Sequence, residues 1–207
     1  MKIFDNWEYI YKNNKRKSKD KSKKIKVACL LAFYNGGKYI KEQLQSILNQ
    51  KKLNFTITIF ISDDLSKEQL PKLKDLKLIN NDDCEILYRR SKKNFGYTIN
   101  FLYSLQSLND NFDYYCFADQ DDIWNKDKIY KSLQILGGYP EKKPSLYFGR
   151  TNYYNEDCSI KIGSSFLFKR SPSFKNAIIQ NMAGGNTMVF NKVAKKIIAS
   201  FGDYAPA

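Results

Sequence analysis

Two short, uninterrupted apolar runs constrain the fold of this chain more than any other feature of its sequence. They are Val27–Leu31 and Tyr115–Ala118, and neither contains a charged residue. Runs of this length are typical of strands that are buried on both faces, as in the middle of a parallel sheet. Between the two runs, apolar residues recur at helical spacing over residues 40–48, so we expect strands to alternate with helices.

The rest of the chain continues this alternation. Residues 65–83 are polar and are expected to form a short helix and a loop. Strands that alternate with helices imply crossover connections, which produce parallel strands with helices packed against the sheet. We therefore predict an α/β fold with a mostly parallel central sheet flanked by helices. The remaining strands are expected at 55–61, 84–88, 145–148 and 187–190, and the remaining helices at 99–108, 126–136 and 192–201.

The fourth predicted strand, at 114–118, runs directly into an acidic segment, Asp119–Asp122. Ligands of parallel sheets bind beyond the carboxyl ends of the strands. On extended backbone, side chains two residues apart point the same way, so Asp119 and Asp121 can share a divalent cation such as Mg²⁺ or Mn²⁺. The alternative is an acidic turn that caps the next helix through Asp122.

Polar residues also follow the first two strands. Tyr34 comes directly before an Asn-Gly-Gly turn, where a nucleotide base can stack on it, although a core aromatic is the alternative. Asp63 and Asp64 end the second strand and can accept a hydrogen bond from a base or ribose, or form an ordinary turn. These residues would meet the acidic segment at one edge of the sheet.

The composition excludes several classes of enzyme. The chain has no histidine, so a Ser-His-Asp triad, a Cys-His pair and a histidine-ligated zinc are all impossible within it. The Walker A and GxGxxG patterns are also missing, which removes support for a P-loop nucleotidase or a Rossmann dehydrogenase. The four cysteines form no CxxC pair and are expected to be reduced and mostly buried. We expect no signal peptide and no membrane-spanning segment, because no apolar stretch approaches roughly 20 residues.

Half of the net charge of +14 lies at the start of the chain, since residues 1–26 hold 10 Lys or Arg against 3 acidic residues. We predict a flexible basic arm at 1–24 and a single domain at 25–207. The arm is either a solvated tail or a contact with an anionic membrane. Nucleic-acid binding is not expected, because the run from Lys12 to Lys26 lacks interleaved aromatic residues.

An ordered set of motifs resembles the family 2 glycosyltransferases, which have a GT-A fold, and most resembles the bacterial rhamnosyltransferase-like group. Each motif is short, but their order along residues 25–191 is specific. The motifs are YNG at 34–36, QLQSILNQ at 43–50, ISDD at 61–64, NFG at 94–96, ADQDDIW at 118–124 and NMAGGNTMVFN at 181–191.

The resemblance implies a metal-dependent, inverting transfer of a sugar to a hydroxyl of a growing bacterial surface polysaccharide. The donor would be a UDP- or dTDP-linked sugar, and the acceptor a saccharide or a lipid-linked saccharide. It also implies a cytoplasmic enzyme, peripheral on the inner face of the cytoplasmic membrane. The implied donor-binding residues are Ala32, Tyr34, Asp63, Asp64 and Asp119, and the implied ligands of Mn²⁺ or Mg²⁺ are Asp119, Asp121 and Asp122.

Other positions carry weaker implications. Arg89, Arg90 or Lys92 would neutralise phosphate or form a solvated basic loop, while Trp124 and the loop at 184–186 would flank the sugar. Leu65 is a departure, because the family usually has glycine after the paired aspartates. This puts the shape of that turn in doubt.

The catalytic base is the missing part of the resemblance. The group's base lies in a later, histidine-containing motif that has no counterpart here, so we expect it beyond Ala207, with Asp203 as a weaker candidate. The chain is then a truncated form. The alternatives are a fragment that binds donor without transferring sugar, or a basic module for a membrane or nucleic acid. A sugar-nucleotide pyrophosphorylase is disfavoured, because its Gly-rich basic loop is absent.

Overall fold

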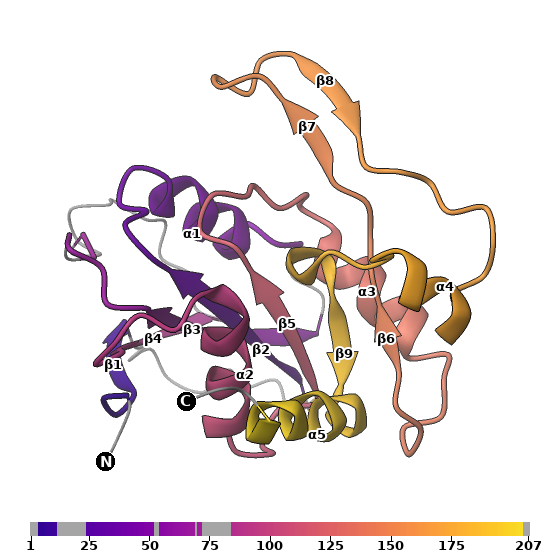
Figure 1. The fold of residues 1–207 in the computed structure, drawn as a ribbon, viewed down its shortest axis with the longest axis horizontal. Helices are drawn as coiled ribbons and strands as arrows, with labels where there is room; N and C mark the ends of the chain where they lie inside the picture. The colour runs from indigo at the N-terminus through magenta and orange to yellow at the C-terminus, as the bar shows by residue number, and fades with distance from the viewer. Residues whose placement is uncertain (1–3, 12–23, 52–53, 69, 72–83, 205–207) are drawn as a thin grey trace.

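Seven strands form a single sheet in the computed structural model (Figure 1), in the order β1-β4-β3-β2-β5-β9-β6. A separate two-stranded hairpin, β7–β8, stands out from the body of the molecule. The structure describes residues 4–11, 24–51, 54–68, 70–71 and 84–204.

The centre of the sheet is parallel, as predicted. β2 pairs in parallel with β3 on one side and with β5 on the other, and β3 pairs in parallel with β4. The strands added outside this centre, β1, β9 and β6, are antiparallel to their neighbours. The strands of the sheet are β1 (Glu8–Tyr11), β2 (Ile25–Phe33), β3 (Phe55–Asp63), β4 (Cys84–Arg90), β5 (Tyr114–Ala118), β6 (Leu146–Tyr147) and β9 (Val189–Asn191).

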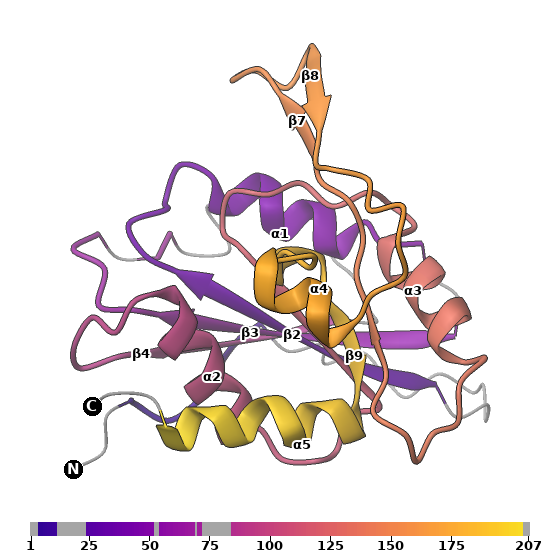
Figure 2. The ribbon, with the colours of Figure 1, turned by 45° about the vertical axis from the view of Figure 1, so that its right-hand side comes forward.

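Helices cover both faces of the sheet, so the core has two halves. Along β2, Val27, Cys29 and Leu31 face the half of the core that packs against α1 and α3. Ala28 and Leu30 face the half that packs against α2 and α5. Figure 2 shows α1 above the sheet and α5 below it. This confirms the α/β class and explains why the run in β2 contains no polar residue. The helices are α1 (Ile40–Leu48), α2 (Tyr97–Ser107), α3 (Lys128–Leu136) and α5 (Lys192–Ser200).

The N-terminal segment differs from the expected flexible arm over residues 4–11. These residues add β1 to the edge of the sheet beside β4, and Phe4 forms a bridge with Ser91. Trp7 packs edge-on against Phe60, with 5.1 Å between the ring centroids. Trp7 packs against the half of the core on the α2 side and Tyr11 against the half on the α1 side, which a solvated tail would not do. The rest of the expected arm, 12–23, lies outside the described residues, as do 69 and 72–83 of the expected helix and loop at 65–83.

Residues 137–188 contribute no buried residue to the core. They contain β6, the hairpin and a short helix, and the hairpin and helix were not expected from the sequence. The hairpin carries Cys158, which is exposed, whereas Cys29, Cys84 and Cys116 are buried. Among the residues that the structure describes, no helix has the length and apolar character needed to cross a membrane. The elements are β7 (Asn152–Tyr154), β8 (Lys161–Ser164), α4 (Phe174–Ile179) and the 3₁₀ turns η1 (Gly185–Thr187) and η2 (Phe201–Tyr204).

Candidate active site

The acidic segment is joined to the end of β2 by the side chain of Gln120. Its amide donates to the Tyr34 carbonyl (3.0 Å) and accepts from the Tyr34 N–H (2.8 Å). The amide lies against Gly36 so closely that any Cβ there would clash with it. The Asn-Gly turn therefore gives the acidic segment room to approach, and the Tyr34 ring stays 44% exposed. The structure thus brings the predicted residues Tyr34 and Asp119–Asp122 to the same edge of the sheet.

Asp63 is fully buried at the end of β3 and organises that strand end. Its carboxylate accepts from the Tyr88 hydroxyl (2.7 Å) and from the Ser66 N–H (2.8 Å), with Nε of Arg90 3.9 Å away. A carboxylate with these partners fixes the turn after β3. Contact between Asp63 and a nucleotide stays a prediction.

Asp64 is also buried, and it holds the start of α2. Its carboxylate accepts from the N–H groups of Phe95 (2.9 Å) and Gly96 (2.7 Å). Gly96 has φ of 79°, a conformation that glycine adopts without strain. Asp64 therefore links the ends of β3 and β4 across the NFG motif. A direct role for it, or for the half-buried Ala32, in binding a base stays a prediction.

Leu65 has φ of 64°, in the left-handed region that favours glycine. This explains why the family that the motifs resemble usually has glycine here, because a side chain in this backbone conformation costs about 1–2 kcal/mol of stability. The turn after the paired aspartates therefore keeps the shape that a glycine would give, at some cost in stability.

Among the described parts of the chain, the carboxylate of Asp119 accepts no hydrogen bond and forms no ion pair, and Lys128 acts on it only through its longer-range charge. It is half-buried, and burial together with the charges of Asp122 and Asp121 raises its pKa to about 6. Burial likewise raises the pKa of Asp122, although Asn186 donates a hydrogen bond to it (2.6 Å). The cluster therefore disfavours its own negative charge, and a bound divalent cation would remove that penalty.

A cation here would need ligands from outside the protein. Within the described ranges, no three His, Cys, Asp or Glu side chains come together as a metal-binding group. Hard divalent cations are commonly held by one or two carboxylates plus phosphate oxygens of a substrate. Asp119 and Asp121 fit that partial ligand set.

Lys128, which the sequence analysis did not single out, ties the acidic segment to η1. Its Nζ donates to the Asn186 carbonyl (2.5 Å) and lies 3.5 Å from the centroid of the Trp124 ring. Burial lowers the pKa of Lys128 to about 8, and Asp122 and Asp119 partly oppose that shift. Trp124 is buried in the core, so its ring does not line the sugar side as expected.

A polar stripe on α1 holds the whole acidic loop. Gln43 donates to the Asp119 carbonyl (2.8 Å), and the Ser46 hydroxyl accepts from the Trp124 N–H (2.9 Å). Gln50 donates to the Asn125 carbonyl (2.8 Å). We call Gln43 and Ser46 on α1, together with Gln50 just after its C-cap residue Asn49, the α1 stripe; all three are buried. Polar residues inside the apolar face of the predicted helix were the signal for this role.

This arrangement of loops at a sheet edge can be compared with known proteins. Residues 29–198 match the sequence model of the family described as Glycosyl transferase family 2. The chain belongs to glycosyl transferase family 2. The match covers the parallel centre of the sheet, the acidic segment and η1, and the observed architecture agrees with the GT-A fold.

Two curated family 2 relatives are similar over part of the chain. The dTDP-rhamnosyl transferase RfbG of Shigella flexneri is 38% identical over 107 residues, which is 51% of this chain and 36% of the relative. The abequosyltransferase RfbV of Salmonella typhimurium is 38% identical over 121 residues, which is 58% of this chain and 34% of the relative. The chain thus aligns with about a third of the length of each.

Solved structures show a more distant likeness. Residues 1–349 of S. aureus TarS match with 20% identity and a TM-score of 0.48, covering 59% of this chain and 34% of that one. The mannosyltransferase PcManGT of Pyrobaculum calidifontis, solved with GDP-Man and Mn²⁺, matches with 16% identity and a TM-score of 0.47, covering 55% and 32%.

Among the basic residues of this family 2 chain, Arg89 does not have the expected role. Its guanidinium is buried, donates to the hydroxyls of Ser62 (3.1 Å) and Ser104 (2.8 Å), and lies 4.4 Å from the centroid of the Trp7 ring. It is neither a phosphate ligand nor part of a solvated loop, because the rings of Phe4 and Trp7 cover it. Arg90 donates to the Ser66 carbonyl, and Lys92 is exposed.

Asp203 is not brought to the acidic segment. It lies on η2, where it accepts a hydrogen bond from Gln106 at the end of α2 (2.8 Å). Figure 1 shows α5, which leads into η2, near the start of β5, whereas Asp119 follows the other end of that strand. The predicted donor-side residues therefore gather at one edge of the sheet, and the predicted base stands apart from them.

Proposed function

We propose that this chain is the donor-binding part of a metal-dependent, inverting glycosyltransferase. The observation that carries the proposal is the half-buried Asp119 carboxylate, without a donor in the described structure and beside Asp122, at the carboxyl end of a parallel strand. The donor is a UDP- or dTDP-linked sugar, and the acceptor is a hydroxyl of a saccharide or lipid-linked saccharide in a growing bacterial surface polysaccharide. The name of the Shigella flexneri relative, a dTDP-rhamnosyl transferase, supports a nucleotide-linked sugar donor.

The residues at the sheet edge have separate tasks in this proposal. Asp119 and Asp121 hold Mn²⁺ or Mg²⁺ together with the donor's diphosphate, and Asn186 orients Asp122 beside them. The chemistry that the cation supplies is neutralisation of the charge that develops on the departing diphosphate. Tyr34 offers its exposed ring to the base, while Gln120 holds the Tyr34 backbone in place. In this way the donor is oriented before an acceptor hydroxyl arrives.

A second candidate is a chain that binds donor without transferring the sugar. An inverting transfer needs a base that removes the acceptor proton, within hydrogen-bond reach of it. Asp203 is hydrogen-bonded to Gln106, away from the acidic segment, and this observation favours a base outside the present sequence. In both candidates we propose that residues 25–207 form the glycosyltransferase domain, with its acceptor side incomplete. We further propose that the protein works at the inner face of the cytoplasmic membrane, aided by its Lys-rich arm.

The decisive experiment is a calorimetric titration of the chain with UDP and with dTDP, in the presence of Mn²⁺ and in the presence of EDTA. Binding should require Mn²⁺ and should weaken at least about tenfold in Asp119→Asn and Asp121→Asn, since each loses a charged ligand of the cation. Asp157→Asn is the matched control, because it makes the same change on the exposed hairpin and should bind normally.

Equal affinity with Mn²⁺ and with EDTA would remove the metal from the proposal. Mn²⁺-dependent binding without transfer to any saccharide acceptor would favour the second candidate.

A further inference from the structure

The short helix α4 and the loop before it expose large apolar side chains that no part of the described structure covers. Phe174 is 80% exposed, Ile178 68% and Ile179 87%. Phe166 and Leu167 on the loop are exposed as well. We call residues 166–183 the α4 surface, which lies at the edge of the molecule in Figure 1. Exposed apolar residues gathered in this way mark an interaction surface.

The charged residues of the α4 surface are all basic. Lys169, Arg170 and Lys175 are exposed among the apolar side chains, and the sequence has no acidic residue between Asp157 and Asp203. Exposed Phe and Ile combined with Lys and Arg are typical of segments that lie in the interface of an anionic bilayer. The net charge of +14 adds long-range attraction to such a surface.

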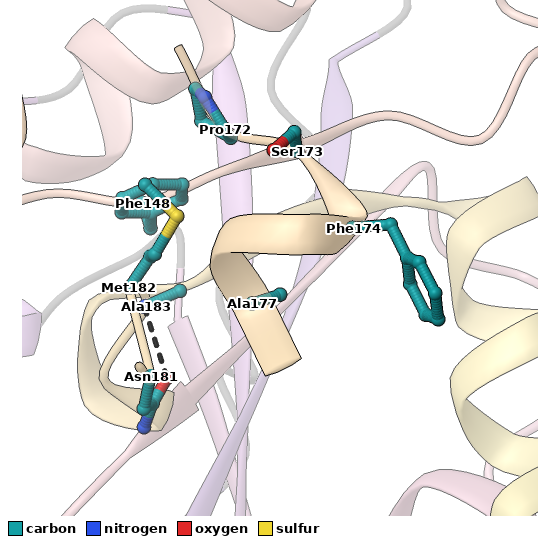
Figure 3. Close-up of a pocket in the computed structure, with 8 residues that line it drawn as sticks. All are labelled: Phe148, Pro172, Ser173, Phe174, Ala177, Asn181, Met182 and Ala183. Atoms are coloured by element: carbon teal, nitrogen blue, oxygen red, sulfur yellow. Dashed lines mark hydrogen bonds between the residues drawn. The ribbon is translucent and has the colours of Figure 1, made fainter. Parts of the chain in front are cut away.

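Two cavities lie within the α4 surface. One, of about 390 Å³, is lined by Phe148, Met182 and Ala183 on one side and by α4 on the other (Figure 3). The other, of about 300 Å³, is lined by Phe166 and Ile179 together with Lys169 and Arg170. Both cavities are therefore mainly apolar, and the second has two cations at its rim. Apolar hollows beside cations fit acyl chains with their phosphate headgroups.

We propose that the α4 surface docks on an anionic phospholipid bilayer. Phe174, Ile178 and Ile179 enter the boundary between headgroups and acyl chains, while the three basic side chains pair with lipid phosphates. A second copy of the chain is a poorer partner for this surface. A symmetric contact between two copies would bring the same basic side chains together, with no acidic residue nearby to pair with them.

The α4 surface is followed in the chain by η1, which contacts the acidic segment. Ala183 lines the first cavity, and the next residues form η1, where Asn186 donates to Asp122. Docking through α4 would therefore hold the candidate donor site close to the bilayer. The proposal does not depend on sugar transfer, because it concerns the binding of this surface alone.

The test is co-sedimentation of the full chain with vesicles of phosphatidylcholine, with and without phosphatidylglycerol. Phe174→Ser combined with Ile179→Ser should lower the partition coefficient at least about tenfold, since two apolar side chains no longer enter the bilayer. Lys169→Gln combined with Arg170→Gln should lower it about fivefold per charge on phosphatidylglycerol vesicles. Thermal unfolding should be unchanged, because all four side chains are exposed.

Matched controls change the same residue types elsewhere. Ile135→Ser combined with Ile197→Ser removes two exposed isoleucines from α3 and α5, and Lys142→Gln combined with Lys143→Gln removes two exposed charges. Both controls should bind vesicles nearly as the original chain does. The control with two fewer lysines separates local pairing from the general effect of net charge.

Three outcomes would overturn the proposal. The first is unchanged vesicle binding in the Phe174→Ser, Ile179→Ser variant. The second is binding that is lost only when the lysines of the N-terminal arm are replaced by glutamine. The third is a dimer of the original chain in sedimentation velocity that this α4 variant dissociates, which would assign the surface to a second copy.

Discussion

Leu65 holds a backbone conformation that its side chain disfavours, with φ of 64°. Because glycine adopts this conformation freely, Leu65→Gly should raise the free energy of unfolding. The strain relieved is about 1–2 kcal/mol, and the greater freedom of glycine in the unfolded chain offsets roughly half of it. Urea denaturation should therefore show a gain of about 0.5–1 kcal/mol.

The control for this change is Leu167→Gly, because Leu167 is also exposed but does not have a positive φ. That variant should lose stability or stay the same. A loss of stability in Leu65→Gly would mean that the Leu65 side chain contributes more than its backbone strain costs.

Lys195 is a buried cation whose partners fasten α5 to the segment after α2. Its Nζ donates to the Leu108 carbonyl (2.9 Å) and to Asp110 (3.1 Å), and this hydrogen bond lowers the pKa of Asp110. A lowered pKa in the folded state means that the pair stabilises the protein above the ordinary pKa of aspartate. That contribution is lost as pH falls through this range.

Asp110→Asn should therefore destabilise the protein by about 1 kcal/mol at pH 7, a modest value because Asp110 is partly exposed. The difference from the original chain should shrink towards zero as the pH falls through the lowered pKa of Asp110 in the folded state. Chemical denaturation across this pH range measures both. Lys196→Met is the control, because Lys196 lies 3.5 Å from Asp110 but is itself exposed. An equal effect of both substitutions would show that burial of Lys195 is unimportant.

At the scale of elements, α1 holds the loop that carries the acidic segment through hydrogen bonds between its side chains and the loop backbone. The side chain of Gln50 also contacts α3, because its amide oxygen Oε1 accepts a hydrogen bond from the Ile129 N–H in the first turn of that helix (3.0 Å). Asp127, the residue at the N-cap position of α3, makes no capping bond with its side chain. Gln50, just after the end of α1, therefore satisfies an N–H group at the start of α3 that α3 does not satisfy itself.

Gln50→Leu should leave buried polar groups unpaired and lower the free energy of unfolding by about 2 kcal/mol. It should also weaken Mn²⁺-dependent nucleotide binding, since the acidic loop loses an anchor although no proposed ligand is changed. Urea denaturation and the same calorimetric titration measure the two effects. Gln134→Leu, at an exposed position on α3, is the matched control and should change neither. Normal nucleotide binding in a destabilised Gln50→Leu would confine the α1 stripe to a structural role.

At the scale of the whole molecule, the sequence was informative where burial imposed a pattern. The bounds of α1 and β5 were predicted correctly, because helices and strands that pack into the core repeat their apolar residues at a fixed spacing. The hairpin β7–β8 and α4 bury no residue, so they left no such pattern. β1 was missed because its place in the sheet depends on pairing with β4 and on the contacts of Trp7 with Arg89 and Phe60, all of which are distant in the sequence.

The candidate site follows the same rule. The acidic segment was recognisable because it ends a buried strand, and the structure places it beside Tyr34 through Gln120. The partners of Gln43 and Lys128 could not be predicted, although Gln43 is visible as a polar residue inside an apolar helix face, because these contacts join elements that are far apart in the sequence. Spacing reveals which residues end a strand, but it does not reveal which polar side chains will support them.

The position of β1 has a consequence for how the protein behaves among its own copies. Without β1, β4 would be the outermost strand, with a row of backbone N–H and C=O groups open to pairing with another sheet. β1 occupies that row, and Trp7 anchors it against Phe60. β1 is then the edge strand itself, but it has only four residues where β4 has seven, and its register shifts between Tyr9 and Tyr11. Short and irregular edge strands pair poorly with other sheets, so shortened versions of the protein should keep residues 4–11.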